Sequence, residues 1–152
     1  MTLWDFAAEI WRRPGLEAAC LALQDDDGQC VPLLLWRLWT LAERRAVSAG
    51  TVAAAVAVAR GWNDSVVAPL RAIRLVLRPP RPPVDDDARL ALRARLRDAE
   101  LAAERALFEA LEGLTTAGGG PWDAPLPALL ELARAWGAPA PEERLAGLAA
   151  AL

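Results

Sequence analysis

Apolar residues fill almost every position of residues 31–45, which read VPLLLWRLWTLAERR. Pro32 suits the first turn of a helix, because its ring fixes φ near the helical value. A helix that is apolar on all sides must be covered on all sides by the rest of the chain. The pattern therefore predicts a buried central helix from Pro32 to Arg45, and the other segments are expected to surround it.

Two shorter helices are predicted before the central one. Thr2 is a suitable N-cap for the first, with Asp5 at the capping-box position. The apolar residues of this helix follow the spacing of one buried face: Leu3, Phe6, Ala7, Ile10 and Trp11. The second helix is expected over residues 16–24, and it ends in the turn Asp25-Asp26-Asp27-Gly28, because acids are unfavourable at a helix C-terminus.

Two further helices are predicted after the central one. Ser48 is a suitable N-cap for a helix over residues 51–60, and Gly61 is expected to end it. The next helix is expected over residues 65–78. Pro69 falls in its second turn, where proline removes a backbone donor and clashes with the preceding turn, so a kink or a late start is expected there.

The longest predicted helix, at about residues 86–114, follows a proline-rich connector at residues 78–84. Its apolar positions recur every three or four residues and are expected to form its buried stripe: Ala88, Leu92, Leu96, Ala99, Ala103, Leu107, Leu111 and Leu114. Its opposite face is expected to carry the charged residues Arg93, Arg97, Glu100, Glu104 and Glu112.

These elements predict an all-α fold, a helical bundle of about five to six helices around the buried central helix. Residues 1–114 are expected to form the bundle domain. Residues 115–152 are expected to form a loop rich in glycine and proline, at residues 115–127, and a tail of two short helices at residues 128–136 and 141–151. A chain of 152 residues is long enough to bury a core.

The chain contains no histidine, lysine or tyrosine, and all 17 basic residues are arginines. Without imidazole there is no Ser-His or Cys-His nucleophile, and without lysine there is no Schiff base. The two cysteines, Cys20 and Cys30, lack the spacing and the additional ligands of a zinc site. We therefore assign no catalytic residue, metal ligand or cofactor, and an enzyme that relies on Asp, Glu and Cys for acid-base chemistry is left as an open alternative.

The net charge of −3 and the pI of about 5.0 give the chain no overall attraction for nucleic acid or anionic lipid, so neither is an expected partner. The N-terminal residues lack the basic start and apolar run of a secretion signal. No apolar run approaches the roughly 20 residues that span a bilayer. These features predict a cytoplasmic protein without a membrane segment.

The segment at residues 60–81 carries five arginines and a single acidic residue. One interpretation is an anion- or partner-binding surface formed by Arg60, Arg71, Arg74 and Arg78. The alternative is a structural role, in which these arginines are solvated or pair with Glu100 and Glu104 of the long helix. Nucleic acid stays open as a partner through this surface only.

Five of the tryptophans lie in the first 62 residues: Trp4, Trp11, Trp36, Trp39 and Trp62. Large rings either fill the core of an alanine-rich bundle or line an apolar ligand cavity. The second interpretation adds a buried polar network, and its candidate residues are Asp5, Trp39, Trp62, Glu100 and Glu104.

Five blocks of the sequence occur in an order found in a known family. They are LWDF at residues 3–6, PGLEAACLALQD at 14–25, LLL with Leu38-Trp39 at 33–39, VVAPLRAIR at 66–74 and AELAAER at 99–105. The chain resembles a family of small, all-helical proteobacterial proteins described as a domain of unknown function. Cys30 and Pro32 stand where the family pattern has Asp and Asn, which weakens the case for a polar site at the start of the central helix. The resemblance covers residues 3–111 and implies no activity.

Two functions from different classes follow from these observations. The first is a non-catalytic interaction protein that binds a protein partner or a second copy through the arginine face or the long helix. The alternative is a small-molecule binder or enzyme with a Trp-lined cavity in the bundle.

Overall fold

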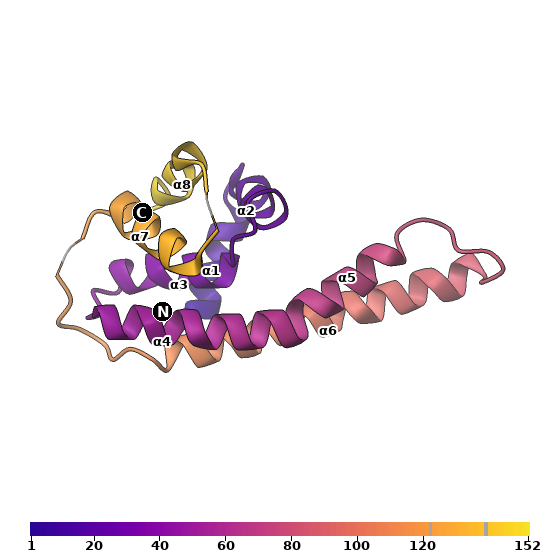
Figure 1. The fold of residues 1–152 in the computed structure, drawn as a ribbon, viewed down its shortest axis with the longest axis horizontal. Coiled ribbons are helices and arrows are strands. Elements are labelled where there is room, and N and C mark those ends of the chain that lie inside the picture. Colours follow the sequence, from indigo (N-terminus) through magenta and orange to yellow (C-terminus); the bar gives the residue numbers. More distant parts are fainter. Residues whose placement is uncertain (122, 139) are drawn as a thin grey trace.

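The computed structural model describes residues 1–121, 123–138 and 140–152, and it confirms the all-α helical bundle (Figure 1). Position 122 of the predicted loop and position 139 of the tail lie outside the described residues. In chain order the helices are α1 (Leu3–Arg12), α2 (Leu16–Asp25), α3 (Val31–Ala42), α4 (Ala49–Trp62), the π-helix η1 (Asn63–Val67), α5 (Ala68–Val76), α6 (Asp86–Glu112), α7 (Pro125–Trp136) and α8 (Glu142–Ala149).

The buried central helix is confirmed as α3. All of its residues from Val31 to Leu41 are buried, and α1, α2, α4, α6 and α7 pack around it. The helix ends at Ala42 rather than at Arg45. Arg44 takes a left-handed conformation with a φ of 50°, and its carbonyl accepts a hydrogen bond from the backbone of Gly120 at 3.0 Å. The loop after α6 thus packs where the helix stops.

Thr2 caps α1 as predicted, since its Oγ1 accepts a hydrogen bond from the Asp5 backbone at 3.1 Å. The predicted buried face is confirmed for Leu3, Phe6, Ala7 and Ile10. It is wrong for Trp11, which is 37% exposed. Trp11 lies at the edge of the apolar face and borders a surface cleft instead of the core.

The predicted helix end at Gly61 is wrong. The chain continues from α4 through η1 into α5 without a break. Gly61 costs the helix some stability, but it does not interrupt the backbone hydrogen bonds. The π-helix ends at Val67, two residues before Pro69, whose ring would clash with the preceding turn of a regular α-helix. The irregularity expected at Pro69 therefore takes the form of a wider turn.

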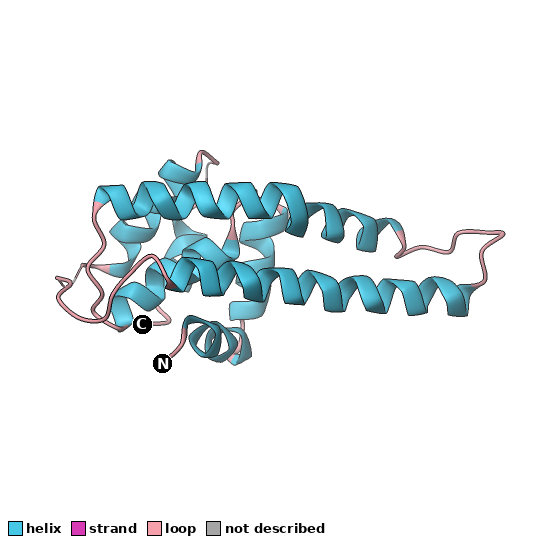
Figure 2. Cartoon of the chain, turned by 90° about the horizontal axis from the view of Figure 1, so that it is seen from below, coloured by secondary structure: helices cyan, strands magenta, loops and turns pink. Residues whose placement is uncertain are grey.

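α5 and α6 form a hairpin joined by the proline-rich connector, and its distal part extends beyond the other helices (Figure 2). α5 packs on η1 and on α6. The second half of α6 packs on α1, α3 and α4. We call residues 68–100, which comprise α5, the connector and the first half of α6, the arm.

The predicted stripe of α6 is confirmed only in its second half. Ala103, Leu107 and Leu111 are buried, whereas Leu92 is 49% exposed. Glu100, expected on the solvent face, is only 7% exposed. The exposure of Leu92 and the burial of Glu100 have the same cause. The first half of α6 packs on α5 and turns the face that carries Glu100 toward that helix.

The C-terminal helices pack on the rest of the chain. α7 contacts α3 and α4, and α8 contacts α2 and α7. The indole Nε1 of Trp136 donates to the carbonyl of Gly28 at 2.8 Å. The division into a domain at residues 1–114 and a tail stays a prediction. Within the described ranges no helix is both long enough and apolar enough to cross a membrane.

Candidate functional site

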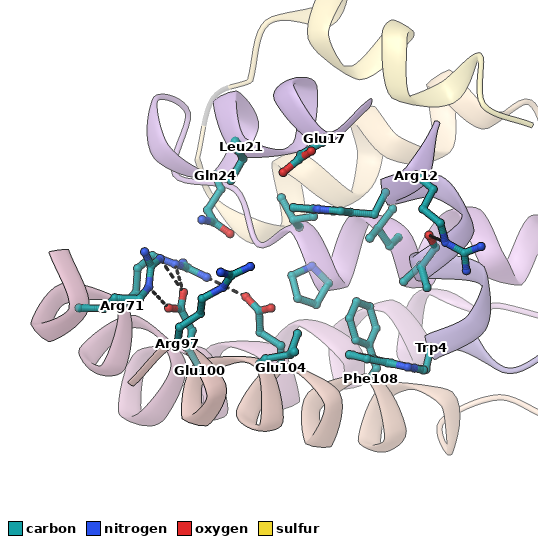
Figure 3. A pocket seen from close by; sticks show the side chains of 18 residues that line it. Trp4, Arg12, Glu17, Leu21, Gln24, Arg71, Arg97, Glu100, Glu104 and Phe108 are labelled. Atoms are coloured by element: carbon teal, nitrogen blue, oxygen red, sulfur yellow. Dashed lines mark hydrogen bonds and ion pairs between the residues drawn. The ribbon is translucent and has the colours of Figure 1, made fainter. Parts of the chain in front are cut away.

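A cleft of about 600 Å³ opens where the arm joins the body of the molecule (Figure 3). Residues of α1, α2, α3, α5 and α6 line it. Most of the charged side chains gather at one end, beside Arg71 and Glu100, whereas Trp4 and Phe108 lie at the other end, where Arg12 also lies, and Glu17 borders the cleft between the two ends (Figure 3). The cleft is therefore amphipathic along its length.

The charged end is a four-residue cluster between α5 and α6. Arg71 donates from Nε to Oε1 of Glu100 at 2.8 Å and from Nη2 to Oε1 of Glu104 at 2.9 Å. Arg74 donates from Nε to Oε2 of Glu100 and from Nη2 to its Oε1 at 3.3 Å. Each residue pair has the helical spacing of three or four, so the antiparallel helices present two arginines to two glutamates. This is the pairing that the structural interpretation of the arginine face predicts.

The two carboxylates differ in their electrostatics. Burial alone would raise the pKa of Glu100, but hydrogen bonds from Arg74 and Arg71 outweigh that effect and hold this pKa below its ordinary value. The pKa of Glu104 lies above its ordinary value, because burial disfavours its charged form more than Arg71 favours it. Glu100 is thus the firm anchor of the cluster, and Glu104 is the carboxylate that protonates more readily.

This difference predicts opposite behaviour for two similar variants. Glu100→Gln should lower the free energy of unfolding at neutral pH by about 2–3 kcal/mol, because it removes hydrogen bonds between charged groups. Glu104→Gln should leave stability unchanged or raise it, because it removes a buried charge that the fold disfavours. A carboxylate whose pKa is lowered by folding stabilises the fold at neutral pH, and this contribution is lost as the pH falls through that pKa. A carboxylate whose pKa is raised by folding destabilises the fold at neutral pH, and this cost is removed as the pH falls.

Denaturant titrations at pH 7 and below pH 4.5, the ordinary pKa of glutamate, would measure both effects. The deficit of Glu100→Gln relative to the parent protein should shrink at the lower pH. Equal losses for the two variants at neutral pH would contradict the assignment of Glu100 as the anchor.

The apolar end is built from aromatic and aliphatic residues of α1, α3 and α6. Trp4 and Phe108 pack edge to face, with ring centroids 5.9 Å apart and an interplanar angle of 72°. Pro32 and Leu35 of α3 also line the cleft, so the central helix contributes to its apolar wall. Trp11 of α1 also lines the cleft.

Residues 2–111 match the family described as "Protein of unknown function (DUF2390)". The chain belongs to this family. No curated protein and no solved structure is significantly similar to the chain. Every residue that lines the cleft, from Trp4 to Phe108, lies within the DUF2390 region, and the helices after it contribute none. The cleft is thus a feature of the DUF2390 region itself.

The four arginines predicted as one surface do not lie together. Arg71 and Arg74 line the cleft of the DUF2390 region. Arg60 lies on α4, where its guanidinium stacks on the ring of Trp136 at 4.4 Å and donates to the carbonyl of the same residue. Arg78 lies beyond the end of α5 and is exposed.

The residues predicted to line a cavity also lie at separate places in the structure. Glu100 and Glu104 line the cleft, whereas Asp5 bonds to Thr2 at the start of α1. Trp39 is fully buried and donates to the carbonyl of Met1 at 3.0 Å. Trp62 is 39% exposed, donates to the carbonyl of Ala103 at 2.8 Å and borders a separate, smaller hollow beside α6.

Sequence reasoning did not select Arg97, Gln24 or Phe108 as site residues, although all three line the cleft. The spacing of Arg97, three residues before Glu100, already places both on one helix face, which was the available signal. Nothing in the sequence indicates that α2, which carries Gln24, lies across the cleft from that face.

Cys20 and Cys30 are free and buried. Burial raises their pKa values to about 11 and about 12. A thiol with such a pKa is almost entirely protonated at neutral pH and is a poor nucleophile. Over the part of the chain that the structure describes, no cluster of three or more His, Cys, Asp or Glu side chains is placed to hold a metal ion.

Proposed function

We propose that this protein is a non-catalytic interaction protein and that its arm docks on a protein partner. One observation carries the proposal: the arm projects from the body and exposes many large apolar side chains. They are Ile73, Leu75, Val76, Val84, Leu90 and Leu92, with exposed fractions from 47% to 56%. Exposed apolar residues scattered singly are ordinary, but a concentration of them on one projecting element is typical of an interaction surface.

The geometry of the arm explains why the described part of the chain leaves these side chains about half exposed. Two packed helices bury only the stripes that face each other. In the arm, part of the facing surface is taken by the Arg71, Arg74 and Glu100 cluster instead of by apolar side chains. Arg89 takes a further part, where its guanidinium bonds to the carbonyls of Leu77 and Arg78 at 2.7 and 3.0 Å. The apolar side chains on the outer faces remain available to a partner.

The charge of the arm indicates the chemistry of that partner. Residues 68–100 contain eight arginines and five acidic residues, although the whole chain has a net charge of −3. The arm thus combines an excess of positive charge with exposed apolar residues. A partner with an acidic, amphipathic helix complements both features, because leucine-like side chains would cover the apolar surface and carboxylates would pair with the arginines.

Site-specific photocrosslinking in cells of the native host would test this function. A benzophenone amino acid at Leu90 should give a discrete adduct with one protein, and mass spectrometry should find an acidic amphipathic helix at the crosslink. The matched control is the same amino acid at Leu152, which is 42% exposed but far from the arm in sequence. The expected result is an adduct at Leu90 and none at Leu152.

Other outcomes of this experiment would overturn the proposal. An adduct with RNA or lipid would assign the arm to a different class of partner, and the absence of any adduct at Leu90 would remove the arm as a docking element. As a check on specificity, Leu90→Asp should abolish binding of the crosslinked partner to the purified protein.

A second candidate function, ligand binding, is favoured by a different observation, the amphipathic cleft of about 600 Å³. Small-molecule sites are concave, mostly apolar and supplied with a few converging polar groups. This cleft combines those properties.

A further inference from the structure

We propose that the cleft binds an amphipathic anion, a free small molecule with one carboxylate or a similar group and an apolar body. The proposal rests on the second candidate function and does not require the docking of the arm, although Arg71, Arg74 and Arg97 belong both to the arm and to the cleft. Neither the exposed apolar residues at Leu90 and Leu92 nor the connector lines the cleft.

The anionic group is indicated by unused donors at the charged end. Arg71 and Arg74 each use Nε and Nη2 in their bonds to the two glutamates, which leaves Nη1 of each without a hydrogen-bond partner among the described residues. Arg97 lines the same end from α6 (Figure 3). Its guanidinium makes no hydrogen bond or ion pair with any residue of the described ranges. Three guanidinium groups thus offer donors to one end of the cleft.

The two glutamates orient these arginines without cancelling their charge. Over the whole lining, four arginines stand against three glutamates, because Arg12 and Glu17 line the cleft as well, so one positive charge remains in excess even when every carboxylate is ionised. Glu100 holds Arg71 and Arg74 in place through both of its oxygens. A preorganised guanidinium loses less conformational entropy when it binds an anion, and its planar donors match a carboxylate. The excess charge fits a ligand with a single negative group.

The apolar body is indicated by the opposite end. From Arg97 to Phe108 the cleft follows α6 for eleven residues, which corresponds to about 16 Å at the rise of an α-helix. Over that distance α6 contributes the apolar side chains of Leu101 and Phe108 to the lining, with Glu104 between them in sequence. A volume of about 600 Å³ lies within the range of small-molecule sites. A medium-length alkyl chain or an aryl group, with its anionic head at Arg97, fits this arrangement.

Decanoate is a suitable probe, and decanol is its matched neutral analogue. Isothermal titration calorimetry on the full chain at neutral pH should show saturable binding of decanoate, at least about tenfold tighter than that of decanol, because only decanoate engages the guanidinium groups. Arg97→Gln should reduce this preference at least about tenfold. Arg97 is exposed and has no described partner, so its replacement leaves the fold intact, which a thermal melt would verify.

Three variants complete the experiment. Arg95→Gln changes an exposed arginine of the same helix that does not line the cleft, and it should not alter decanoate binding. Trp11→Gln, which replaces an apolar ring of the lining, should weaken decanoate and decanol alike. Leu90→Asp should change neither, so failure of arm docking is distinguishable from failure of ligand binding. Absence of saturable decanoate binding, equal affinity for decanol, or equal effects of Arg95→Gln and Arg97→Gln would overturn the proposal.

Discussion

Replacing Trp39 by alanine should lower the free energy of unfolding by about 3–5 kcal/mol, the range found when a large buried ring is truncated. Trp39 is fully buried in α3. Its Nε1 donates to the carbonyl of Met1 at 3.0 Å, and the guanidinium of Arg45 stacks on its ring at 4.0 Å. The substitution therefore leaves a cavity in the core and removes contacts that tie the N-terminus and the end of α3 together.

For a chain of this size the loss corresponds to a Tm lower by about 6–20 °C. Calorimetry or a denaturant titration would measure it. The matched control is Trp62→Ala, which removes the same side chain from a site that is 39% exposed and should cost less than half as much. Similar losses for the two variants would contradict the role of α3 as the buried centre of the fold.

Replacing Arg71 by glutamate should cost about 3 kcal/mol, because removal of one partner from a largely buried ion pair leaves the others uncompensated. The side chain of Arg71 is 15% exposed, and it bridges Glu100 and Glu104. The variant would place a third carboxylate beside these two. It should also abolish any preference of the cleft for an anion, because the excess positive charge would be lost.

Arg78→Glu is the matched control for this substitution. Arg78 belongs to the same sequence pattern but is exposed, and no described residue forms an ion pair with its side chain. Its replacement should change stability by no more than about 0.5 kcal/mol, as is usual at the surface. Equal effects of the two variants would show that the pairs between α5 and α6 contribute no more than solvated charges do.

The local elements of the fold could be predicted from the sequence to the extent that each depends on its own residues. The capping of α1 by Thr2 and the burial of α3 follow from local chemistry and composition, and both are confirmed. The continuation of the helix through Gly61 could not be predicted, because it depends on how the packing of α4 and α5 on α6 offsets the cost of glycine. The stripe of α6 is apolar along its whole length, but only its second half packs on the body of the molecule. Its burial therefore could not be predicted from the apolar pattern alone.

The candidate site shows the same division. The pairing of Arg71 with Glu100 and Glu104 could be considered from sequence, because helical spacing places each set of residues on one face. The sequence could not identify Trp4 and Phe108 as the aromatic end of the cleft, because the early tryptophans alone do not indicate which of them fills the core and which lines a cleft. Trp39 is buried by its helix and Trp4 is left at a cleft edge, and that distinction arises only when α1, α2 and α6 pack around α3.

The π-helix between α4 and α5 has a consequence for the comparison of related sequences. Ala59 faces the interior, and Arg71 follows it by twelve residues. At 100° per residue, a regular α-helix would rotate Arg71 about 120° away from Ala59, whereas one residue absorbed in the wider turn reduces this to about 20°. A relative without that extra residue would need its arginines one position earlier, at 70 and 73, to meet the same glutamates. An alignment of such chains therefore requires a one-residue gap between Trp62 and Ala68 to keep the charged partners in phase.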